Sequence, residues 1–237
     1  MKEEGRAVLE SKHRQTTYKG LLEYAAAGLH AASMDLFRKY VPTGSKVLDL
    51  GSGGGAWAMR LFDVPYDVTA CDLEPREGFD FPFRKLDLNK NFSELFPADQ
   101  FDAVSMVEVI EHLENPRHAI RQAKALLKKG GVIFLTTPNA SGLYSRLRFF
   151  FTGEMAMFTD SSYRDMGHIT PLTAWHLDKL ILENNLTLLE RRFHDAPFFP
   201  PRSLGEVAKV FAWALFRGFM FGTVGGQCIL LALRKND

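Results

Sequence analysis

The segment EVIEHL, residues 108–113, groups side chains that can move protons or bind a metal ion. Glu108, Glu111 and His112 stand at positions i, i+3 and i+4, a spacing that shares one face of a helix. Carboxylates and imidazoles ligate Mg, Mn, Fe and Zn, and either group can act as a general base. A further imidazole, His168, follows later in the chain.

Three interpretations of this segment stay open on the residues alone. In the first, His112 or Glu108 acts as a base or orients an acceptor. In the second, Glu108 and Glu111 join His112 and His168 to bind a divalent cation. In the third, the carboxylates stabilise the N-terminus of a helix and His112 packs beneath a cofactor. The elements that position the segment must decide among them.

The whole chain has the composition of one globular domain over residues 1–237. It has 237 residues, of which 46% are hydrophobic, and a net charge of +1, so no basic footprint for nucleic acid is visible. Cys71 and Cys228 are predicted to be buried free thiols, which suits the cytoplasm. The N-terminus lacks the apolar core of a signal peptide. Charged residues and glycines interrupt the apolar region 207–235, so no transmembrane segment is predicted.

Strand and helix patterns alternate along the chain. Apolar runs predict these strands: 46–50, 66–73, 83–88, 101–109, 132–139, 186–195 and 227–235. Helical patterns cover 16–40, within an N-terminal helix cap at 16–44, and 56–62, 116–131 and 171–185. This alternation predicts an α/β fold with a mostly parallel sheet covered on both faces.

The segment KVLDLGSGGGAW, residues 46–57, predicts a strand, a glycine loop and a helix. Backbone amides at such a helix start can meet a negatively charged ligand, and glycines let it approach closely. Asp49 lies two residues before Gly51, where a carboxylate would repel a pyrophosphate but attract a cationic amino group or a sulfonium. The loop therefore favours S-adenosylmethionine over a dinucleotide. Asp72 can accept hydrogen bonds from the ribose of either cofactor, and Asp87 can approach an adenine edge.

Four segments in this order resemble the class I S-adenosylmethionine-dependent methyltransferases: VLDLGSGGG, VTACDLEP, FDAVSMVEVIEHLENP and GGVIFLTTPN. The likeness covers roughly residues 20–195 and is greatest to the branch with the ubiquinone-biosynthesis O-methyltransferases. It implies a doubly wound, Rossmann-like seven-stranded sheet, mostly parallel with an antiparallel last strand, and helical or lid insertions. The implied cofactor contacts are Asp49, Gly51, Ser52 and Gly53 for the methionine part, His30 for its carboxylate, Asp72 with Leu73 for the ribose, Asp87 with Leu88 for the adenine, and Val107 with Glu108 near the sulfur.

The same resemblance keeps a metal ion in view. Ubiquinone-type enzymes and small-RNA 3′-end methyltransferases are metal-assisted and have a similar Glu-x-x-Glu-His pattern with a later His. Many relatives with diverse acceptors also have a similar Glu-His pair. The resemblance therefore implies a possible cation site at Glu108, Glu111, His112 and His168 without requiring one.

Two segments exceed the simple alternation, a lid or acceptor insertion at 139–170 and an aromatic-rich insertion at 196–224. Their aromatics suit core packing, an apolar acceptor pocket, or peripheral membrane contact through 204–221. Basic residues accompany them, namely Arg146, Arg148, Arg202, Lys209 and Arg217. Further candidates for the acceptor side are Tyr18, Tyr144, Tyr163 and His168.

The predicted function is methyl transfer from S-adenosylmethionine to oxygen of a small-molecule or lipid-like acceptor, in the cytoplasm or at the membrane periphery. No nucleic-acid partner is expected. One alternative is a non-catalytic relative that binds S-adenosylmethionine as a sensor or scaffold. The other is a dinucleotide-dependent oxidoreductase, which Asp49 disfavours.

Overall fold

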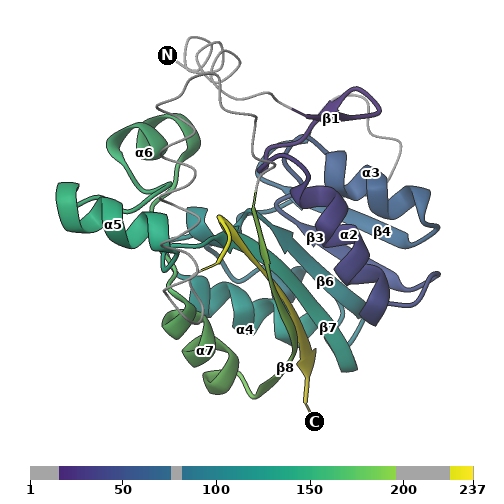
Figure 1. The fold of residues 1–237 in the computed structure, drawn as a ribbon. Helices are drawn as coiled ribbons and strands as arrows, with labels where there is room; N and C mark the ends of the chain where they lie inside the picture. Colours follow the sequence, from purple (N-terminus) through teal and green to yellow (C-terminus); the bar gives the residue numbers. More distant parts are fainter. Residues whose placement is uncertain (1–15, 76–81, 196–224, 237) are drawn as a thin grey trace.

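The computed structural model describes residues 16–75, 82–195 and 225–236. The central strands are β3 (Lys46–Leu50), β4 (Asp67–Asp72), β5 (Phe83–Lys85), β6 (Phe101–Val107), β7 (Leu127–Pro138), β8 (Leu186–His194) and β9 (Cys228–Lys235). They form one seven-stranded sheet in the order β5-β4-β3-β6-β7-β9-β8 (Figure 1). The last strand, β9, runs antiparallel to both β7 and β8, and the pairs from β5 through β7 are parallel. The predicted fold class is confirmed.

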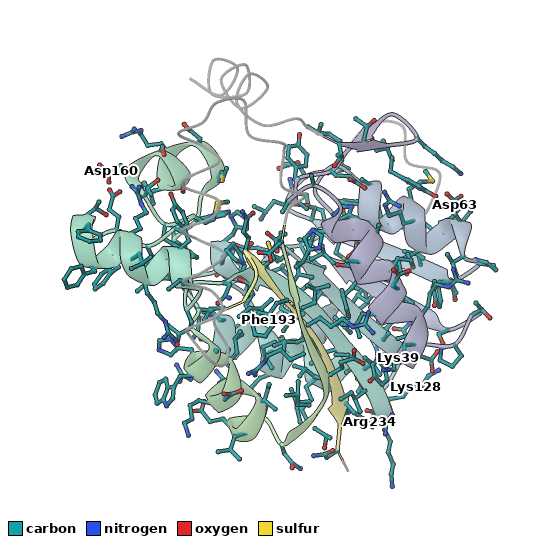
Figure 2. All side chains as sticks on the ribbon, viewed as in Figure 1. Lys39, Asp63, Lys128, Asp160, Phe193 and Arg234 are labelled. Atoms are coloured by element: carbon teal, nitrogen blue, oxygen red, sulfur yellow. The ribbon has the colours of Figure 1, made fainter. Side chains whose placement is uncertain are left out.

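Helices cover both faces of this sheet. The α-helices of the described residues are α2 (Leu29–Tyr40), α3 (Ala56–Asp63), α4 (Pro116–Leu126), α5 (Leu143–Thr152), α6 (Asp160–Met166) and α7 (Ala174–Glu183). One core cluster joins α2 and α3 to the sheet, and a second joins α4 and α7 to its other face. Side chains fill the space between helices and strands (Figure 2). The helices α5 and α6 form a lobe beside this sandwich (Figure 1).

Local sequence explains why these helices form where they do. In α4, the Asn115 side chain caps the first turn by accepting a hydrogen bond from the His118 N–H, and Pro116 occupies the first helical position. Ala119, Ile120, Ala123 and Leu126 then recur at helical spacing and are buried. The strand β7 is buried on both faces from Gly131 to Pro138, as a central strand of a covered sheet must be.

The predicted N-terminal helix at 16–40 is wrong in its first half. Residues 17–22 form a hairpin of β1 (Thr17–Tyr18) and β2 (Leu21–Leu22), and the helix begins only at Leu29. The turn residues Lys19 and Gly20 both have positive φ, 50° and 81°, which suits a tight hairpin and cannot continue a helix. The apolar spacing of this region also fits a helix, but Leu21 and Leu22 lie half-buried in the hairpin.

Three other boundaries differ from the sequence prediction. The third strand ends at Lys85 instead of residue 88, and the fourth ends at Val107 instead of residue 109. The helix α4 ends at Leu126, and Lys128–Gly131 already belong to β7. The helix predicted over 116–131 is therefore too long, because its last residues begin the strand that pairs with β6, and this pairing outweighs local preference.

The insertion at 139–170 consists of α5, α6 and their loops, whereas the insertion at 196–224 lies outside the described residues. Among the helices that the structure describes, none combines the length and apolar character needed to cross a bilayer.

Candidate functional site

The glycine loop after β3 is shaped by close packing at two of its glycines. A Cβ on Gly51 would lie 2.6 Å from a methyl carbon of Val109, and the residue has φ +73°. A Cβ on Gly54 would lie 2.7 Å from the backbone oxygen of Leu22 in the hairpin. Both positions therefore exclude any side chain. The loop is held between the end of β6 on one side and the β1–β2 hairpin on the other.

Asp72, at the end of β4, ties the glycine loop to the neighbouring strand. Its Oδ2 accepts a hydrogen bond from the Gly53 N–H (2.6 Å), and its Oδ1 accepts one from the Leu73 N–H (2.7 Å). A carboxylate has about four lone-pair sites, so Asp72 retains acceptor capacity for ribose hydroxyls. Leu73 is 58% exposed, an apolar side chain next to this carboxylate.

Asp49 is buried beneath the glycine loop with only part of its carboxylate satisfied. Its Oδ1 accepts a hydrogen bond from the Ser105 hydroxyl (2.8 Å), while its Oδ2 is buried without a partner in the part of the chain that the structure describes. Burial, opposed by the Ser105 hydrogen bond and aided by the Asp72 charge, raises the pKa of Asp49 to about 7. An unpartnered buried carboxylate oxygen is a favourable position for a cationic ligand group.

The remaining predicted cofactor contacts lie at neighbouring strand ends. Asp87 accepts a hydrogen bond from the Asn89 N–H (3.0 Å) and lies 3.6 Å from the Lys90 ammonium, and Leu88 is buried. Val107 is the half-buried last residue of β6. His30, in the first turn of α2, is buried against the Trp57 ring, with its Nδ1 3.4 Å from a Glu23 carboxylate oxygen.

The buried polar atoms of this half of the site fit the methionine part of S-adenosylmethionine. Among the described residues, the Asp49 Oδ2 and the Ser52 hydroxyl are buried without a hydrogen-bond partner, and the buried His30 Nδ1 has the Glu23 carboxylate 3.4 Å away. Together they offer an acceptor for an ammonium and donor groups for a carboxylate, which are the two charged groups of an amino acid. Buried polar groups are ordinarily satisfied, so this set points to a ligand that completes it.

Glu108 follows β6 in a strained backbone conformation. Its φ is 54°, rare for a residue with a side chain. The Thr136 side chain holds it in place, because its oxygen accepts from the Glu108 N–H (3.0 Å) and donates to Glu108 Oε1 (2.8 Å). Burial raises the pKa of Glu108 to about 7. The Cys228 thiol lies 3.9 Å from Oε2.

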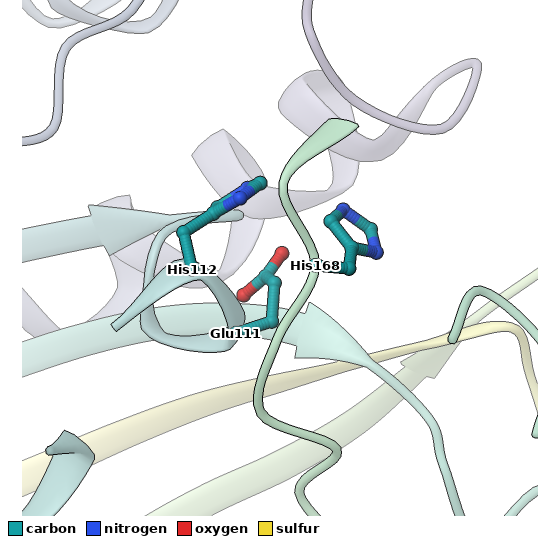
Figure 3. A group of neighbouring side chains, drawn as sticks. All are labelled: Glu111, His112 and His168. Atoms are coloured by element: carbon teal, nitrogen blue, oxygen red, sulfur yellow. The ribbon is translucent and has the colours of Figure 1, made fainter. Parts of the chain in front are cut away.

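Glu111, His112 and His168 converge at one point. Their potential ligand atoms all lie within 4.8 Å of one another, and Figure 3 shows the Glu111 carboxylate beside the two imidazole rings, which meet edge to face. Glu111 Oε2 accepts from the Thr137 hydroxyl (3.1 Å), whereas Oε1 is buried without a partner among the described residues. Among the described residues, this is the cluster whose geometry suits a metal ion. Glu108 is not part of it.

Both histidines of the cluster have one ring nitrogen fixed by a backbone carbonyl. His112 Nδ1 donates to the Gly167 oxygen (3.1 Å), and His168 Nδ1 donates to the Met157 oxygen (2.7 Å). These bonds leave Nε2 of each ring with the lone pair. Donation of the second ring nitrogen to a carbonyl is the usual support of a metal-binding histidine.

The loop that carries His168 is fastened to the EVIEHL segment by backbone contacts. The N–H groups of Ile169 and Thr170 both donate to the backbone carbonyl oxygen of Glu111 (3.0 and 2.9 Å). The Thr170 hydroxyl donates to the Leu113 oxygen (2.6 Å). These bonds bring His168 beside residues that precede it by more than fifty positions, and they explain why the three side chains meet.

Burial governs the electrostatics of the cluster. It lowers the pKa of His168 to about 4, with the His112 charge adding to the effect, and it also lowers the pKa of His112. Burial raises the pKa of Glu111 well above its ordinary value, as does the neighbouring Glu108 charge. Both imidazoles are therefore neutral near pH 7, which is the form that ligates a metal.

The structure bears differently on the three interpretations of EVIEHL. The N-cap of α4 is Asn115, and no hydrogen bond from that helix start reaches Glu108 or Glu111 in the part of the chain that the structure describes. Residues 110–112 form only one 3₁₀ turn, η2 (Ile110–His112), so the prediction that Glu108, Glu111 and His112 share a helix face is wrong.

The predicted acceptor-side residues lie in different places. Tyr18 packs against α3 on the glycine-loop side, with the Arg60 guanidinium 3.9 Å from its ring centre. Tyr144 and Tyr163, in α5 and α6, are both 62% exposed. Arg146 is exposed, and Arg148 pairs with Glu154. Arg202, Lys209, Arg217 and the segment 204–221 lie outside the described residues.

Four site residues escaped the sequence analysis: Glu23, Thr136, Thr137 and Cys228. Thr136 and Thr137 end an apolar strand, and two polar residues at that position were a usable signal. Cys228 was expected to be a buried free thiol, which is confirmed, but its approach to Glu108 spans 120 positions of sequence. Glu23 lay in the stretch predicted as a helix, so its role could not be seen.

Comparison with known proteins agrees with the fold. A model of a methyltransferase domain matches residues 13–208. A ubiquinone biosynthesis O-methyltransferase of Xanthomonas axonopodis pv. citri is 33% identical over 129 residues, which cover 50% of this chain and 48% of that protein. One from Haemophilus ducreyi is 36% identical over 110 residues, covering 40% of this chain and 46% of that protein. The chain thus spans about half the length of the curated relatives it matches.

Among solved structures, a SAM-dependent methyltransferase from Archaeoglobus fulgidus superimposes with a TM-score of 0.60 and 18% identity, covering 87% of this chain and 94% of that one. At this identity the likeness shows the fold alone. The family match extends over most of the chain, and the sheet order is the one the fold prediction implies. The chain belongs to the methyltransferase domain family, whose S-adenosylmethionine-dependent members share this sheet.

Proposed function

We propose that this protein transfers a methyl group from S-adenosylmethionine to an oxygen of a small-molecule or lipid-like acceptor, with a divalent cation at the acceptor side. Membership of the family, the unsatisfied polar atoms of Asp49 and Ser52, and the buried His30 imidazole support the cofactor. The ubiquinone biosynthesis O-methyltransferases among its relatives support an oxygen acceptor. The observation that carries the proposal is the convergence of Glu111, His112 and His168 beside the end of β6.

In this proposal the glycine-loop half of the site binds and orients the cofactor. When bound, S-adenosylmethionine supplies a methyl group on a sulfonium, an already activated leaving group. The Asp49 Oδ2 faces the amino group, and the Ser52 hydroxyl and His30 hold the carboxylate. Asp72 holds the ribose, with Leu73 beside it, and Asp87 and Leu88 border the adenine. Gly51 and Gly53 keep the loop close to the ligand. Such positioning provides much of the rate of an in-line transfer.

The acceptor half must remove a proton, because an un-ionised hydroxyl is a poor nucleophile. Glu111 and the Nε2 atoms of His112 and His168 would hold a divalent cation, which when bound lowers the pKa of an acceptor hydroxyl. Glu108 is then the proposed proton acceptor, since its carboxylate stands outside the cluster and its pKa of about 7 suits a general base. If no metal binds, His112 is the other candidate base.

A lipid-like acceptor is supported by the exposed aromatic surface of α5. Phe150 and Phe151 are 79% and 77% exposed, and Phe149 and Tyr144 are also exposed beside them. Exposed apolar patches of this kind mark contact surfaces, and aromatic side chains suit a membrane interface. Together with the segment 204–221, this surface is proposed to bring the enzyme to a membrane.

The test is methyl transfer from labelled S-adenosylmethionine across a panel of phenols, carboxylates and amines. We expect transfer to phenols, a dissociation constant for S-adenosylhomocysteine in the micromolar range, and loss of transfer after metal removal that Mg²⁺, Mn²⁺ or Zn²⁺ restores. Absence of cofactor binding would refute the function. Full activity after exhaustive chelation would refute the cation and leave His112 and Glu108 as the candidate bases.

A further inference from the structure

The β1–β2 hairpin is fastened to α3 by a set of contacts on its outer side. The Tyr18 hydroxyl donates to Asp63 Oδ2 (2.7 Å), and the Lys19 ammonium lies 2.6 Å from Asp63 Oδ1. The Arg60 guanidinium stacks over the Tyr18 ring at 3.9 Å. Asp63 lies at the far end of α3, where it can be seen in Figure 2. The hairpin is therefore docked onto the helix that the glycine loop opens.

Glu23, directly after the hairpin, is a buried carboxylate with four polar contacts. Its Oε2 accepts from the Thr16 hydroxyl (2.5 Å), and its Oε1 accepts from Nε (3.0 Å) and Nη2 of Arg60. The same Oε1 lies 3.4 Å from His30 Nδ1. His30 first, then Thr16 and Arg60, hold the pKa of Glu23 at about 2. The carboxylate is ionised and is only 6% exposed.

The position of Glu23 links three separate parts of the cofactor half. Thr16 belongs to the chain before the hairpin, Arg60 to α3, and His30 to the first turn of α2. The hairpin also packs closely against the glycine loop, since a Cβ on Gly54 would lie 2.7 Å from the backbone oxygen of Leu22. The Tyr24 ring lies 3.0 Å from the same position. Glu23 is thus the buried centre of a cap over the loop.

We propose that Glu23 is a positioning residue for cofactor binding, which fastens the hairpin over the glycine loop and holds the His30 imidazole at the methionine end. This inference rests on the proposed function. Removing the carboxylate frees His30 and Arg60 and loosens the cap, even though Glu23 belongs to none of the groups proposed to contact the cofactor. Because hairpin docking and ligand binding share these contacts, each strengthens the other.

The experiment compares Glu23→Gln with the wild type and with Glu190→Gln. Glu190 is a matched control, because it is also an ion-paired glutamate with a low pKa, yet its partners Lys39, Tyr40 and Arg192 lie away from the loop. Calorimetry with S-adenosylhomocysteine measures affinity. Hydrogen exchange of amides 17–24, with and without this ligand, measures hairpin docking, and ¹⁵N shifts report the His30 tautomer.

For Glu23→Gln we expect a dissociation constant for S-adenosylhomocysteine about 10- to 100-fold higher than that of the wild type, in the usual range of coupling between sites. The ligand should no longer slow exchange in the hairpin, the His30 ring shifts should change, and kcat at saturating cofactor should stay within about threefold of wild type. Glu190→Gln should match the wild type in all of these. Binding of Glu23→Gln within about twofold of wild type would overturn the inference.

If Glu23→Gln does not fold, Tyr18→Phe decides the question, because it removes only the outer hydroxyl contact with Asp63. Faster hairpin exchange together with weaker binding supports the inference, and faster exchange with an unchanged dissociation constant overturns it. Failure of the wild type to bind S-adenosylhomocysteine is a different result, since it refutes the proposed function itself.

Discussion

The cofactor half of the site and the acceptor half are built from different lengths of chain. In the cofactor half, the Gly53 amide and the Asp72 carboxylate that bind each other are 19 residues apart, within one strand–loop–helix–strand unit. In the acceptor half, His112 meets the Gly167 carbonyl across 55 positions, and Glu108 meets Cys228 across 120. Some contacts of the cofactor half are also long, since Ser105 bonds Asp49 across 56 positions. The glycine loop itself is held to Asp72 by a local backbone amide, whereas buried titratable side chains from distant positions make up the acceptor half.

This difference implies different sensitivities. In the cofactor half, a change in the shape of the glycine loop should first lower the affinity for the cofactor or the stability of the fold. A site assembled from distant side chains should lose its chemistry when one of them is replaced, while cofactor affinity remains. Four predictions test that contrast.

The largest effect is expected from the metal cluster. His168→Ala and Glu111→Gln should each lower kcat/KM by about 10³-fold, since they remove a proposed ligand of a catalytic cation. Affinity for S-adenosylhomocysteine, measured by calorimetry, should change by less than about threefold. His118→Ala is a control, because that half-buried ring hydrogen-bonds the Lys90 carbonyl and not a member of the cluster. Equal losses of rate and cofactor affinity would contradict the separation of the two halves.

The next effect concerns the loop itself. Gly51→Ala should lower the free energy of unfolding by about 3 kcal/mol, because a side chain at φ +73° is strained and its Cβ would clash with Val109. Chemical denaturation measures this loss. Adding Val109→Ala should restore part of the stability by making room. If the double variant is no more stable than the sum of the two single losses predicts, the clash is not the cause.

A smaller loss is expected at the support of Glu108. Thr136→Val should lower the free energy of unfolding by about 2 kcal/mol. The substitution removes the hydroxyl that bonds both the backbone N–H and the Oε1 atom of the strained Glu108. Thermal unfolding should show a melting temperature lower by roughly 4–8 °C. Thr187→Val, whose hydroxyl bonds an exposed Asn236, should leave the melting temperature nearly unchanged. Equal shifts in both variants would show that Thr136 has no special role.

The smallest effect is a pH dependence of cofactor binding through Asp49. Its folded pKa of about 7 is raised above the usual value, so the carboxyl is protonated below pH 7 and attracts a cation only as pH rises. Because the pKa is higher in the folded state than in the unfolded state, Asp49 favours the folded, ligand-free protein below about pH 4. This contribution to stability is lost as pH rises through 7. Calorimetry should find affinity for S-adenosylmethionine rising by up to about tenfold per pH unit below 7. Asp49→Asn should remove this slope, and an identical slope in that variant would assign it to another group.

Parts of the molecule whose structure is set by neighbouring residues were predictable. The strand, glycine loop and helix at 46–57 follow from a local pattern, and so do the acidic residues that end β4 and the alternation of strands and helices. The hairpin at 17–22 was not predictable as such, because its apolar spacing also fits a helix and the Glu23–Arg60 ion pair spans 37 positions. The start of β7 was missed because strand pairing outweighed the local helical pattern.

The amino-acid sequence by itself determined the sheet, the cofactor loop and the presence of two carboxylates with two histidines, since these depend on residue type and short spacing. Only the tertiary structure decided which of those groups meet. The loop bonds of Ile169 and Thr170 bring His168 to Glu111, while Thr136 turns the Glu108 carboxylate elsewhere. Side chains that are distant in the sequence meet because backbone hydrogen bonds join their segments, and these bonds cannot be inferred from residue spacing alone.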